Sequence, residues 1–460
     1  MSAGAMQRAP LFSMATRPVF TQHSQFKRIS CIREGRCFLV RRFSCCSRRG
    51  RAGHAEDNDD ARSPRSSIAT APPSGAEGDR LMLQLPQQPF ADARPAHKGV
   101  VRPLKASDVP AVARLFLKIF RRADKPAGAD LQNYLRMLLL ASPSYSETAG
   151  TQVYEQQDGR IRSALLAVPM RFVANGIIVP GRLLGVFMTD AEKEAAGAAQ
   201  LILALRPRRA DLAFCDSASP TSSHHMLAIG SRPIALQNLE WSRSFRPIGA
   251  FAGRFDTRFL RGRAPGLPIL AHPLDSLLRR LLPPGEISNH DGLRVAEIPV
   301  PTFLVHAPRL IAHYAVRPLW AEEELFWLVS LAARNTRLGT FTIRSVLDRS
   351  SAIIGCFVYY AAPGRTAHVL NILALPGREP AVLDAMFHHL DETGHLEARG
   401  RAQAALMAGL ARQRWLVFRH RAFTLALTRI PEINDAIARG DIYLGGLAGE
   451  DWSRLLTDFH

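Results

Sequence analysis

The sequence has 460 residues, 47% of them hydrophobic and 22% charged, and its formal net charge is +19 at pH 7. It is long enough for two or three domains with hydrophobic cores. Residues 1–53 carry eleven Lys and Arg against one Glu. Much of the basic excess therefore belongs to this terminus, and it does not indicate nucleic-acid binding by the rest of the chain.

Residues 1–97 are expected to be a disordered basic tail. They are rich in Arg, Ser and Pro, lack a sustained apolar period and turn acidic at Glu56–Asp60. The Arg-rich, acid-poor first half resembles an organellar transit peptide. A polyanion-binding arm is a second interpretation, and a nonessential leader with Met82 as an alternative start is a third.

The six cysteines predict neither a disulfide framework nor a structural zinc site, because four lie in the tail and none forms a C-x-x-C pair. Cys215 and Cys356 lie in apolar runs and are expected to be small core residues. This usage favours a reducing compartment. We expect a cytoplasmic protein, with import into an organelle through the basic tail as the alternative. No apolar run approaches the roughly 20 residues of a membrane-spanning helix.

The folded part is predicted to begin with a strand and a capped helix. Val100–Leu104 is strand-like, and Asp108 followed by Pro110 is typical of a helix start. Apolar residues then recur at helical spacing. A second helix is predicted over Ala129–Leu140.

A three-stranded meander is predicted next. Its strands are Thr151–Gln157, Arg160–Val173 and Ile177–Thr189. The turns between them contain Asp158-Gly159 and Asn175-Gly176, which are strong hairpin signals because type I′ turns need positive φ at both central residues.

The third strand leads into a loop of small residues and a short helix. Glu194–Ala199 resembles the pyrophosphate loop of the GNAT acyltransferase superfamily, Q/R-x-x-G-x-G/A, which holds the diphosphate of acetyl-CoA. Gly197 and Ala199 match the small positions, whereas Glu194 stands where the family has Gln or Arg. The helix is predicted to end by Leu205, because a proline two residues later disfavours helix before it.

The elements that follow complete the resemblance. They are a buried strand at Asp211–Asp216, a helix at Thr221–Ile229 and a strand at about Ala235–Ser242. Two helices, a meander, a loop, a helix, a strand, a helix and a strand form the GNAT order. The resemblance implies an acyl-CoA-binding domain over residues 98–248.

A weaker copy of the same plan is predicted over residues 292–460, after a connector at 249–291 with one helix, Leu274–Leu282. Pro376–Pro380 stands in place of the phosphate loop and supplies two residues without an N–H group. We therefore expect a degenerate half that scaffolds the first or shapes the acceptor site. Its predicted elements are helix Ala321–Arg334, strands Thr340–Leu347, Ala352–Tyr360 and Ala367–Leu375, helix Ala381–Thr393, and a closing strand and turn at Ile442–Trp452.

The expected fold class is α/β (α+β), with two tandem GNAT-like mixed sheets flanked by helices and a disordered N-terminal tail. The resemblance implies direct transfer of an acyl group from acetyl-CoA, or another acyl-CoA, to an amine without a metal. It assigns CoA binding to the end of the third strand and the loop. The expected CoA-binding residues are Val186, Phe187, Met188, Thr189, Lys193, Glu194, Ala195, Gly197, Ala198 and Ala199.

Three residues are the candidates for proton transfer. Asp190 and Glu192 lie just beyond the third strand. His224 lies on the late helix, where many members carry a Tyr that protonates the thiolate, and histidine exchanges protons near neutral pH. Adjacent side chains on a helix diverge by about 100°, so only one of His224 and His225 can face the site. Other carboxylates on later strands are Asp216 and Glu240.

Three functional classes remain open on the sequence. The first is an N-acyltransferase whose acceptor is an amine: an amino sugar of a surface polysaccharide, an amino acid, a small amine or a protein N-terminus. The second is a non-catalytic GNAT-fold binding or regulatory protein, which Glu194 and the missing Tyr favour. The third is an interaction protein that acts through the basic tail.

Overall fold

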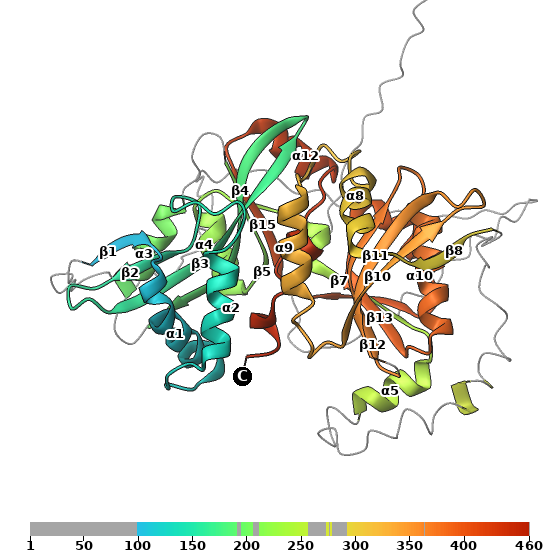
Figure 1. Cartoon of the computed structure of the whole chain (residues 1–460), viewed down its shortest axis with the longest axis horizontal. Helices are drawn as coiled ribbons and strands as arrows, with labels where there is room; N and C mark the ends of the chain where they lie inside the picture. Colours follow the sequence, from blue (N-terminus) through green and yellow to red (C-terminus); the bar gives the residue numbers. More distant parts are fainter. Residues whose placement is uncertain are drawn as a thin grey trace, which may run out of the picture. The chain divides into compact units, whose positions relative to one another are not determined.

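The structure, a computed structural model, describes residues 99–190, 195–205, 211–255, 273–275, 277, 292–362 and 364–459. Figure 1 labels its helices and strands. Within these residues, no helix is both long enough and apolar enough to cross a membrane.

The first sheet is mixed, with one parallel pair. All its neighbouring strands are antiparallel except β4 and β5. A further short strand, β9 (Val316–Pro318), pairs with the end of β3. The strand order is β1 (Val100–Pro103), β2 (Gln152–Glu155), β3 (Ile161–Ala174), β4 (Ile177–Thr189), β5 (Leu212–Ala218), β15 (Phe423–Thr428) and β6 (Arg232–Pro233).

The second sheet repeats this plan. Its only parallel pair among the described strands is β12 with β13, in the place that β4 and β5 hold in the first sheet. The strand order is β14 (Leu416–His420), β7 (Leu239–Ser244), β13 (Glu397–Arg401), β12 (Thr366–Ala374), β11 (Ile353–Ala361), β10 (Thr340–Leu347) and β8 (Arg294–Glu297).

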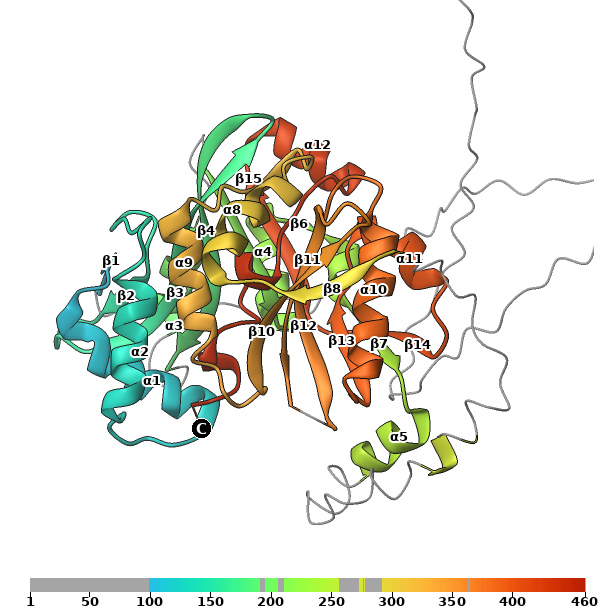
Figure 2. The same ribbon diagram turned by 45° about the vertical axis from the view of Figure 1, so that its right-hand side comes forward.

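The two sheets exchange one strand each. β7 comes from the first half of the chain but pairs with β13 and β14 in the second sheet. β15 comes from the end of the chain but pairs with β5 and β6 in the first sheet. Figure 2 shows the green β7 beside the orange and red strands β13 and β14. The sheets therefore do not coincide with the predicted copies, 98–248 and 292–460. The second sheet contains β7 from the first copy, and the first sheet contains β15 from the second copy.

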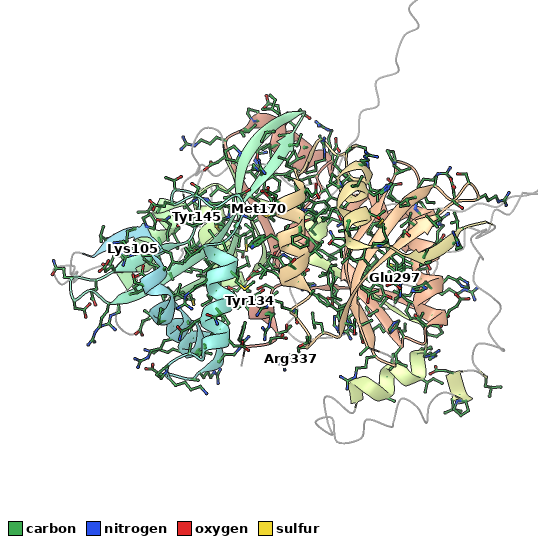
Figure 3. The ribbon with its side chains drawn as sticks, viewed as in Figure 1. Lys105, Tyr134, Tyr145, Met170, Glu297 and Arg337 are labelled. Carbon is green, nitrogen blue, oxygen red and sulfur yellow. The ribbon has the colours of Figure 1, made fainter. Side chains whose placement is uncertain are left out.

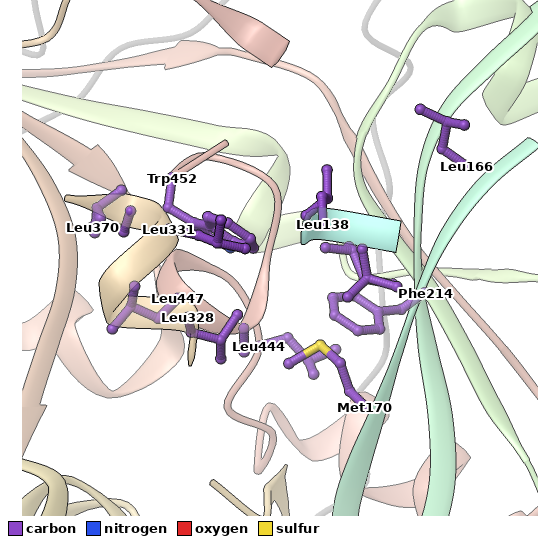
Figure 4. Close-up of a cluster of buried hydrophobic side chains, with 14 of the residues drawn as sticks. Leu138, Leu166, Met170, Phe214, Leu328, Leu331, Leu370, Leu444, Leu447 and Trp452 are labelled. Carbon is purple, nitrogen blue, oxygen red and sulfur yellow. The ribbon is translucent and has the colours of Figure 1, made fainter. Parts of the chain in front are cut away.

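The helices cover the sheets around three apolar clusters. One cluster joins α1, α2, α8 and α9 to both sheets, a second packs α10 on the second sheet, and a third packs α3 and α4 on the first sheet. Figure 4 shows the first cluster, in which Leu138 and Met170 belong to the same buried group as Leu331 and Trp452. The helices are α1 (Val109–Arg121), α2 (Ala129–Leu139), α3 (Ala195–Ala204), α4 (Pro220–Ala228), α5 (Pro247–Phe255), α8 (Val300–Leu310), α9 (Glu322–Ala332), α10 (Glu379–Glu392), α11 (Met407–Ala411) and α12 (Pro431–Arg439).

Most predicted elements are confirmed to within two residues. One of the two predicted hairpin turns has the expected geometry. Asn175 and Gly176 both have positive φ, as a type I′ turn requires. At the other predicted turn only Gly159 has positive φ, so this turn is not type I′. Asp108 precedes α1 as expected, but its carboxylate accepts from Lys105 N–H instead of capping the helix.

Two predicted strands are wrong in extent or kind. Ala235–Asn238 is a 3₁₀ helix, and β7 begins only at Leu239. Ile442–Trp452 contains no strand: it makes one isolated bridge to Val316 and a 3₁₀ turn at Gly446–Ala448. The predicted helix Leu274–Leu282 lies mostly outside the described residues, in which 274, 275 and 277 are helical.

Candidate functional site

β4 and β5 separate part-way along their length. They pair only at Gly181↔Leu212, Arg182↔Ala213 and Leu183↔Phe214, although both strands continue beyond these pairs. Where they part, β4 carries a bulge, because Leu165 pairs with Phe187 whereas Ala167 pairs with Leu184. A bulge bends the strand and re-aims its backbone. We call the opening between the two strands the β4–β5 gap.

A cavity of about 450 Å³ occupies the gap. It is lined by apolar residues that belong to the clusters on the two faces of the sheet, Phe116 and Leu455 on one face and Leu184 and Met226 on the other. The cavity therefore passes through the sheet from the α1 face to the face covered by α3 and α4. We call it the gap cavity. Its lining also includes the polar residues Arg121, Ser217, Ser219, Ser222, His225 and Glu450.

Glu450 brings a carboxylate to the gap from the end of the chain. It is only 6% exposed, and its Oε2 accepts a hydrogen bond from the Ser217 hydroxyl at the end of β5. A Cβ added at Gly185 would lie 3.3 Å from its other oxygen, Oε1, so that oxygen faces the β4 bulge. The carboxylate thus stands between the two strands at the point where they separate.

Burial changes the acid–base character of two groups in the cavity. It raises the pKa of Glu450 to about 8, and the neighbouring Asp216 adds to the rise while the Ser217 hydrogen bond opposes it. A carboxyl group with this pKa can exchange a proton near neutral pH. Burial also raises the pKa of the Cys215 thiol to about 12. The thiolate, which is the reactive form of cysteine, is therefore scarce at this position.

A buried ion network fixes the backbone beside Glu450. The Glu450 N–H donates to both oxygens of Asp216, at 3.2 and 3.3 Å. Arg401 lies 3.6 Å from Asp216 and 3.3 Å from Asp451, and Arg421 lies 2.6 Å from Asp451. Burial raises the pKa of Asp216. Burial would also raise that of Asp451, but Arg401 and Arg421 lower it instead.

The residues that follow Glu450 are anchored to the helices. The Tyr134 hydroxyl on α2 lies 3.4 Å from Ser453 Oγ and accepts from Arg454 N–H at 3.0 Å. Arg121 on α1 donates to the Leu455 carbonyl at 2.8 Å. Arg337 donates to the Thr457 carbonyl; Figure 3 labels Tyr134 and Arg337. These contacts hold residues 442–459, which we call the C-terminal segment, against the first sheet.

The same segment closes the equivalent opening in the second sheet. β12 and β13 pair only from Thr366 to Val369, and Asn371 lies just past that point. Asn371 accepts from Leu447 N–H at 2.8 Å and donates to the Tyr443 hydroxyl at 2.8 Å. Gly446 packs so closely on Asn371 that an added Cβ would overlap its amide. A single stretch of chain therefore fills one gap and supplies a carboxylate to the other.

The order of elements decides the fold. A strand, two helices, an antiparallel meander, α3, β5 and α4 follow one another in the order expected from the sequence. The structure adds that β5 runs parallel to β4 and separates from it. The fold is GNAT-like. No family model matches the sequence, and no curated relative matches it either.

Several solved structures are similar to this chain over most of its length at low identity. A conserved protein from Enterococcus faecalis, described as a "Probable N-Acyltransferase", is 11% identical with a TM-score of 0.48, covering 73% of this chain and 74% of its own. A GCN5-related N-acetyltransferase from Anabaena variabilis is 10% identical with a TM-score of 0.46, covering 72% of each chain. Saccharomyces cerevisiae N-myristoyltransferase with bound myristoyl-CoA is 10% identical with a TM-score of 0.40, covering 72% of this chain and 79% of its own.

Part of the predicted CoA site lies at the β4–β5 gap. Val186 and Phe187 line the gap cavity. Met188 is buried beside them in β4, and the hydroxyl groups of Thr189 and Ser163, on the neighbouring strand β3, are hydrogen-bonded. The predicted residues Glu192, Lys193 and Glu194 lie outside the described residues. Those in α3 are Ala195, Gly197, Ala198 and Ala199, of which Ala198 is half-buried and Ala199 exposed.

Gly197 has a packing role inside α3. It is buried, and an added Cβ would lie 2.8 Å from two atoms of the Tyr154 ring on β2. Close approach of a helix to a strand is one of the uses of glycine. The small side chain at this position is therefore required by the helix–strand contact.

The predicted acid–base residues lie at different places. Asp190 is buried in an ion pair with Lys118 at 2.9 Å, with Arg162 at 3.9 Å. His224 is exposed, and of the two adjacent histidines it is His225 that lines the gap cavity. Of the described carboxylates, Glu450 alone lines the cavity.

Glu450 was missed because its position depends on the whole fold. The sequence interpretation took Ile442–Trp452 as a closing strand and turn, and most of this stretch is buried. The available signal was the pair Glu450-Asp451 inside an otherwise apolar and glycine-rich stretch. Buried carboxylates are rare unless they are paired or functional.

Proposed function

We propose that the protein is an acyl-CoA-dependent N-acyltransferase that transfers the acyl group directly to an amine. The observation that supports this most is the position of Glu450, a buried carboxylate with a raised pKa, at the point where a cavity passes between two separating parallel strands. A cavity of this size with a few convergent polar groups is typical of a small-molecule site.

In this proposal the arm of the acyl-CoA lies in the gap and its thioester lies at the β4 bulge. Backbone groups that are re-aimed by a bulge at Gly185 and Val186 can polarise the thioester carbonyl. The polar side chains Ser219, Ser222 and His225, at the cavity wall beside α4, suit the amide groups of the arm. The diphosphate would lie toward the start of α3, where the sequence resemblance assigns it.

Glu450 is the proposed general base. It takes one proton from the ammonium form of the acceptor, so that the neutral amine attacks the thioester carbon. The carbon–sulfur bond breaks, an amide forms, and the second nitrogen proton goes to the leaving thiolate of CoA. Ser217 acts as a positioning residue, because its hydroxyl donates to the Glu450 carboxylate.

A covalent route through Cys215 is not part of the proposal. This thiol is the only cysteine among the described residues that lines the cavity, and burial raises its pKa to about 12. Direct transfer needs only positioning, polarisation and a base.

The test is calorimetric titration of CoA and acyl-CoA into the full chain, followed by measurement of CoA thiol release with a panel of amines and amino sugars. We expect binding, and turnover that Glu450→Gln reduces about 10²- to 10⁴-fold while CoA affinity is unchanged. Glu323→Gln, an exposed residue on α9, is the matched control. Binding of CoA without turnover on any amine would favour the non-catalytic alternative, and absence of CoA binding would refute the proposal.

A further inference from the structure

The gap cavity has an apolar extension on the α1 side of the sheet. It is formed by one face of α1, by the outward side of the β4 bulge and by the end of the C-terminal segment. We call this part the α1 compartment. Its residues are Phe116, Ile119, Phe120, Val186, Leu455 and Leu456.

Three of these apolar side chains are open to solvent. Phe120 is 43% exposed, and Ile119 and Leu456 are each 36% exposed. Large apolar groups gathered at the mouth of a cavity mark a binding surface for an apolar group. Arg121 also borders the compartment, but its guanidinium is held by the Leu455 and Phe459 carbonyls and stacks on the Phe116 ring at 5.2 Å. The guanidinium of Arg121 is thus bound by groups of the cavity wall.

The route through the sheet decides which part of a bound acyl-CoA reaches the compartment. The polar wall formed by Ser219, Ser222 and His225 lies on the α4 side, and Glu450 stands at the gap. An arm that enters from the α4 side places its thioester at the gap. The part that emerges on the α1 side is then the acyl group, whereas the amine approaches the carbonyl beside Glu450.

We infer that the acyl group is a medium- or long-chain aliphatic group that occupies the α1 compartment. This inference rests on the proposed function and names its acyl donor. An acetyl group ends one carbon beyond the carbonyl and would leave the walls of the compartment in contact with water.

The test compares the affinities of CoA, acetyl-CoA, octanoyl-CoA and palmitoyl-CoA for the full chain by calorimetry. Burial of each methylene is expected to raise affinity about fourfold until the compartment is filled. We expect CoA and acetyl-CoA to bind alike, and octanoyl-CoA to bind about 100-fold or more tightly than acetyl-CoA. Equal affinity for acetyl-CoA and octanoyl-CoA would overturn the inference and leave the proposed function standing. Failure of CoA and all three thioesters to bind would overturn both.

Two variants locate the chain without disturbing the core. Phe120→Glu and Leu456→Glu place charge on partly exposed side chains and should weaken octanoyl-CoA binding about 10-fold or more, while CoA affinity stays within about twofold. Phe326→Glu is the matched control, because Phe326 is a helical residue that is 55% exposed and lies outside the cavity lining. If both variants leave the octanoyl-CoA affinity unchanged, the chain lies elsewhere and the assignment is wrong.

An alkyl group on the acceptor is the competing occupant. In that case octylamine would bind to the CoA complex far more tightly than ethylamine. The affinities of the acyl-CoA thioesters would not depend on chain length. That result would assign the compartment to the acceptor and overturn the acyl assignment.

Discussion

The Ser217 hydroxyl donates a hydrogen bond to Glu450, a residue 233 positions later in the chain. The bond joins the end of β5 to the C-terminal segment where β5 borders the gap cavity. It connects the acid–base behaviour of the site to the docking of the chain terminus, and the first two predictions follow from this.

The rate should rise with pH through the titration of Glu450. Burial raises the pKa of this group to about 8, so the base form is a minority at pH 6 and the majority above pH 8. We expect log kcat/KM to increase with unit slope up to about pH 8 and then to level off. Glu450→Gln should abolish this dependence in its residual activity. A profile that is flat between pH 6 and pH 9 in the wild type would contradict the role of Glu450 as base.

Stability should fall as pH rises over the same range. A carboxyl group whose pKa is raised on folding binds its proton more tightly in the folded state, so ionisation favours unfolding. The destabilisation begins above the ordinary pKa of 4.5 and is complete above about pH 8. Thermal melting of the wild type and Glu450→Gln at pH 6 and pH 8.5 measures it. Relative to the Tm of the wild type, the Tm of Glu450→Gln should be higher at pH 8.5 than at pH 6. The same difference in Tm at both pH values would contradict this prediction.

Gly197→Ala should destabilise the fold whether or not CoA binds. An added Cβ would overlap the Tyr154 ring, and overpacking of this kind costs about 1–3 kcal/mol. Urea unfolding measures the loss, and Gly128→Ala is the control because its Cβ would meet no atom within 4 Å. Loss of CoA binding in a Gly197 variant is therefore interpretable only beside its unfolding curve. Equal stability of Gly197→Ala and Gly128→Ala would show that α3 adjusts to the methyl group.

Arg401→Met should be among the most destabilising single substitutions. Its guanidinium neutralises Asp216 and Asp451 in the protein interior, and removal of one partner from a buried ion network costs about 3–5 kcal/mol. Urea unfolding should show this loss for Arg401→Met and a smaller one for Arg401→Lys, which keeps the charge. Arg412→Met, at an exposed position, should have little effect. A loss for Arg401→Met no larger than that for Arg412→Met would show that the two carboxylates tolerate the loss of the cation.

Local signals predict the first half of the fold well. The Asn175-Gly176 turn sets the register of β3 and β4, which are long apolar runs on either side of it. The elements of the second meander are predicted for the same reason. The strands between residues 397 and 428 were not predicted, although Phe423–Thr428 has the alternating, β-branched character of a strand.

The sequence of a strand does not determine which strand it pairs with. A strand at about Ala235–Ser242 was expected from the GNAT order of elements, but β7 pairs with β13 and β14 of the second sheet. In the same way, Val186 and Phe187 were predicted from the β4 strand that carries them, whereas Glu450 reaches the gap through contacts with residues more than 200 positions away. Sequence reasoning therefore found the side of the site made by local elements and missed the side made by the terminus.

The exchange of β7 and β15 also sets an order on biosynthesis. Domains generally fold during synthesis from the N-terminus, at about 5–20 residues per second. The first sheet cannot place a strand between β5 and β6 until Phe423–Thr428 has been made, which is close to the end of the 460-residue chain. Until then β5 offers an unpaired edge of the kind that recruits other strands. The first half therefore depends on synthesis of Phe423–Thr428 for the strand between β5 and β6, and a product truncated before this strand has an open sheet.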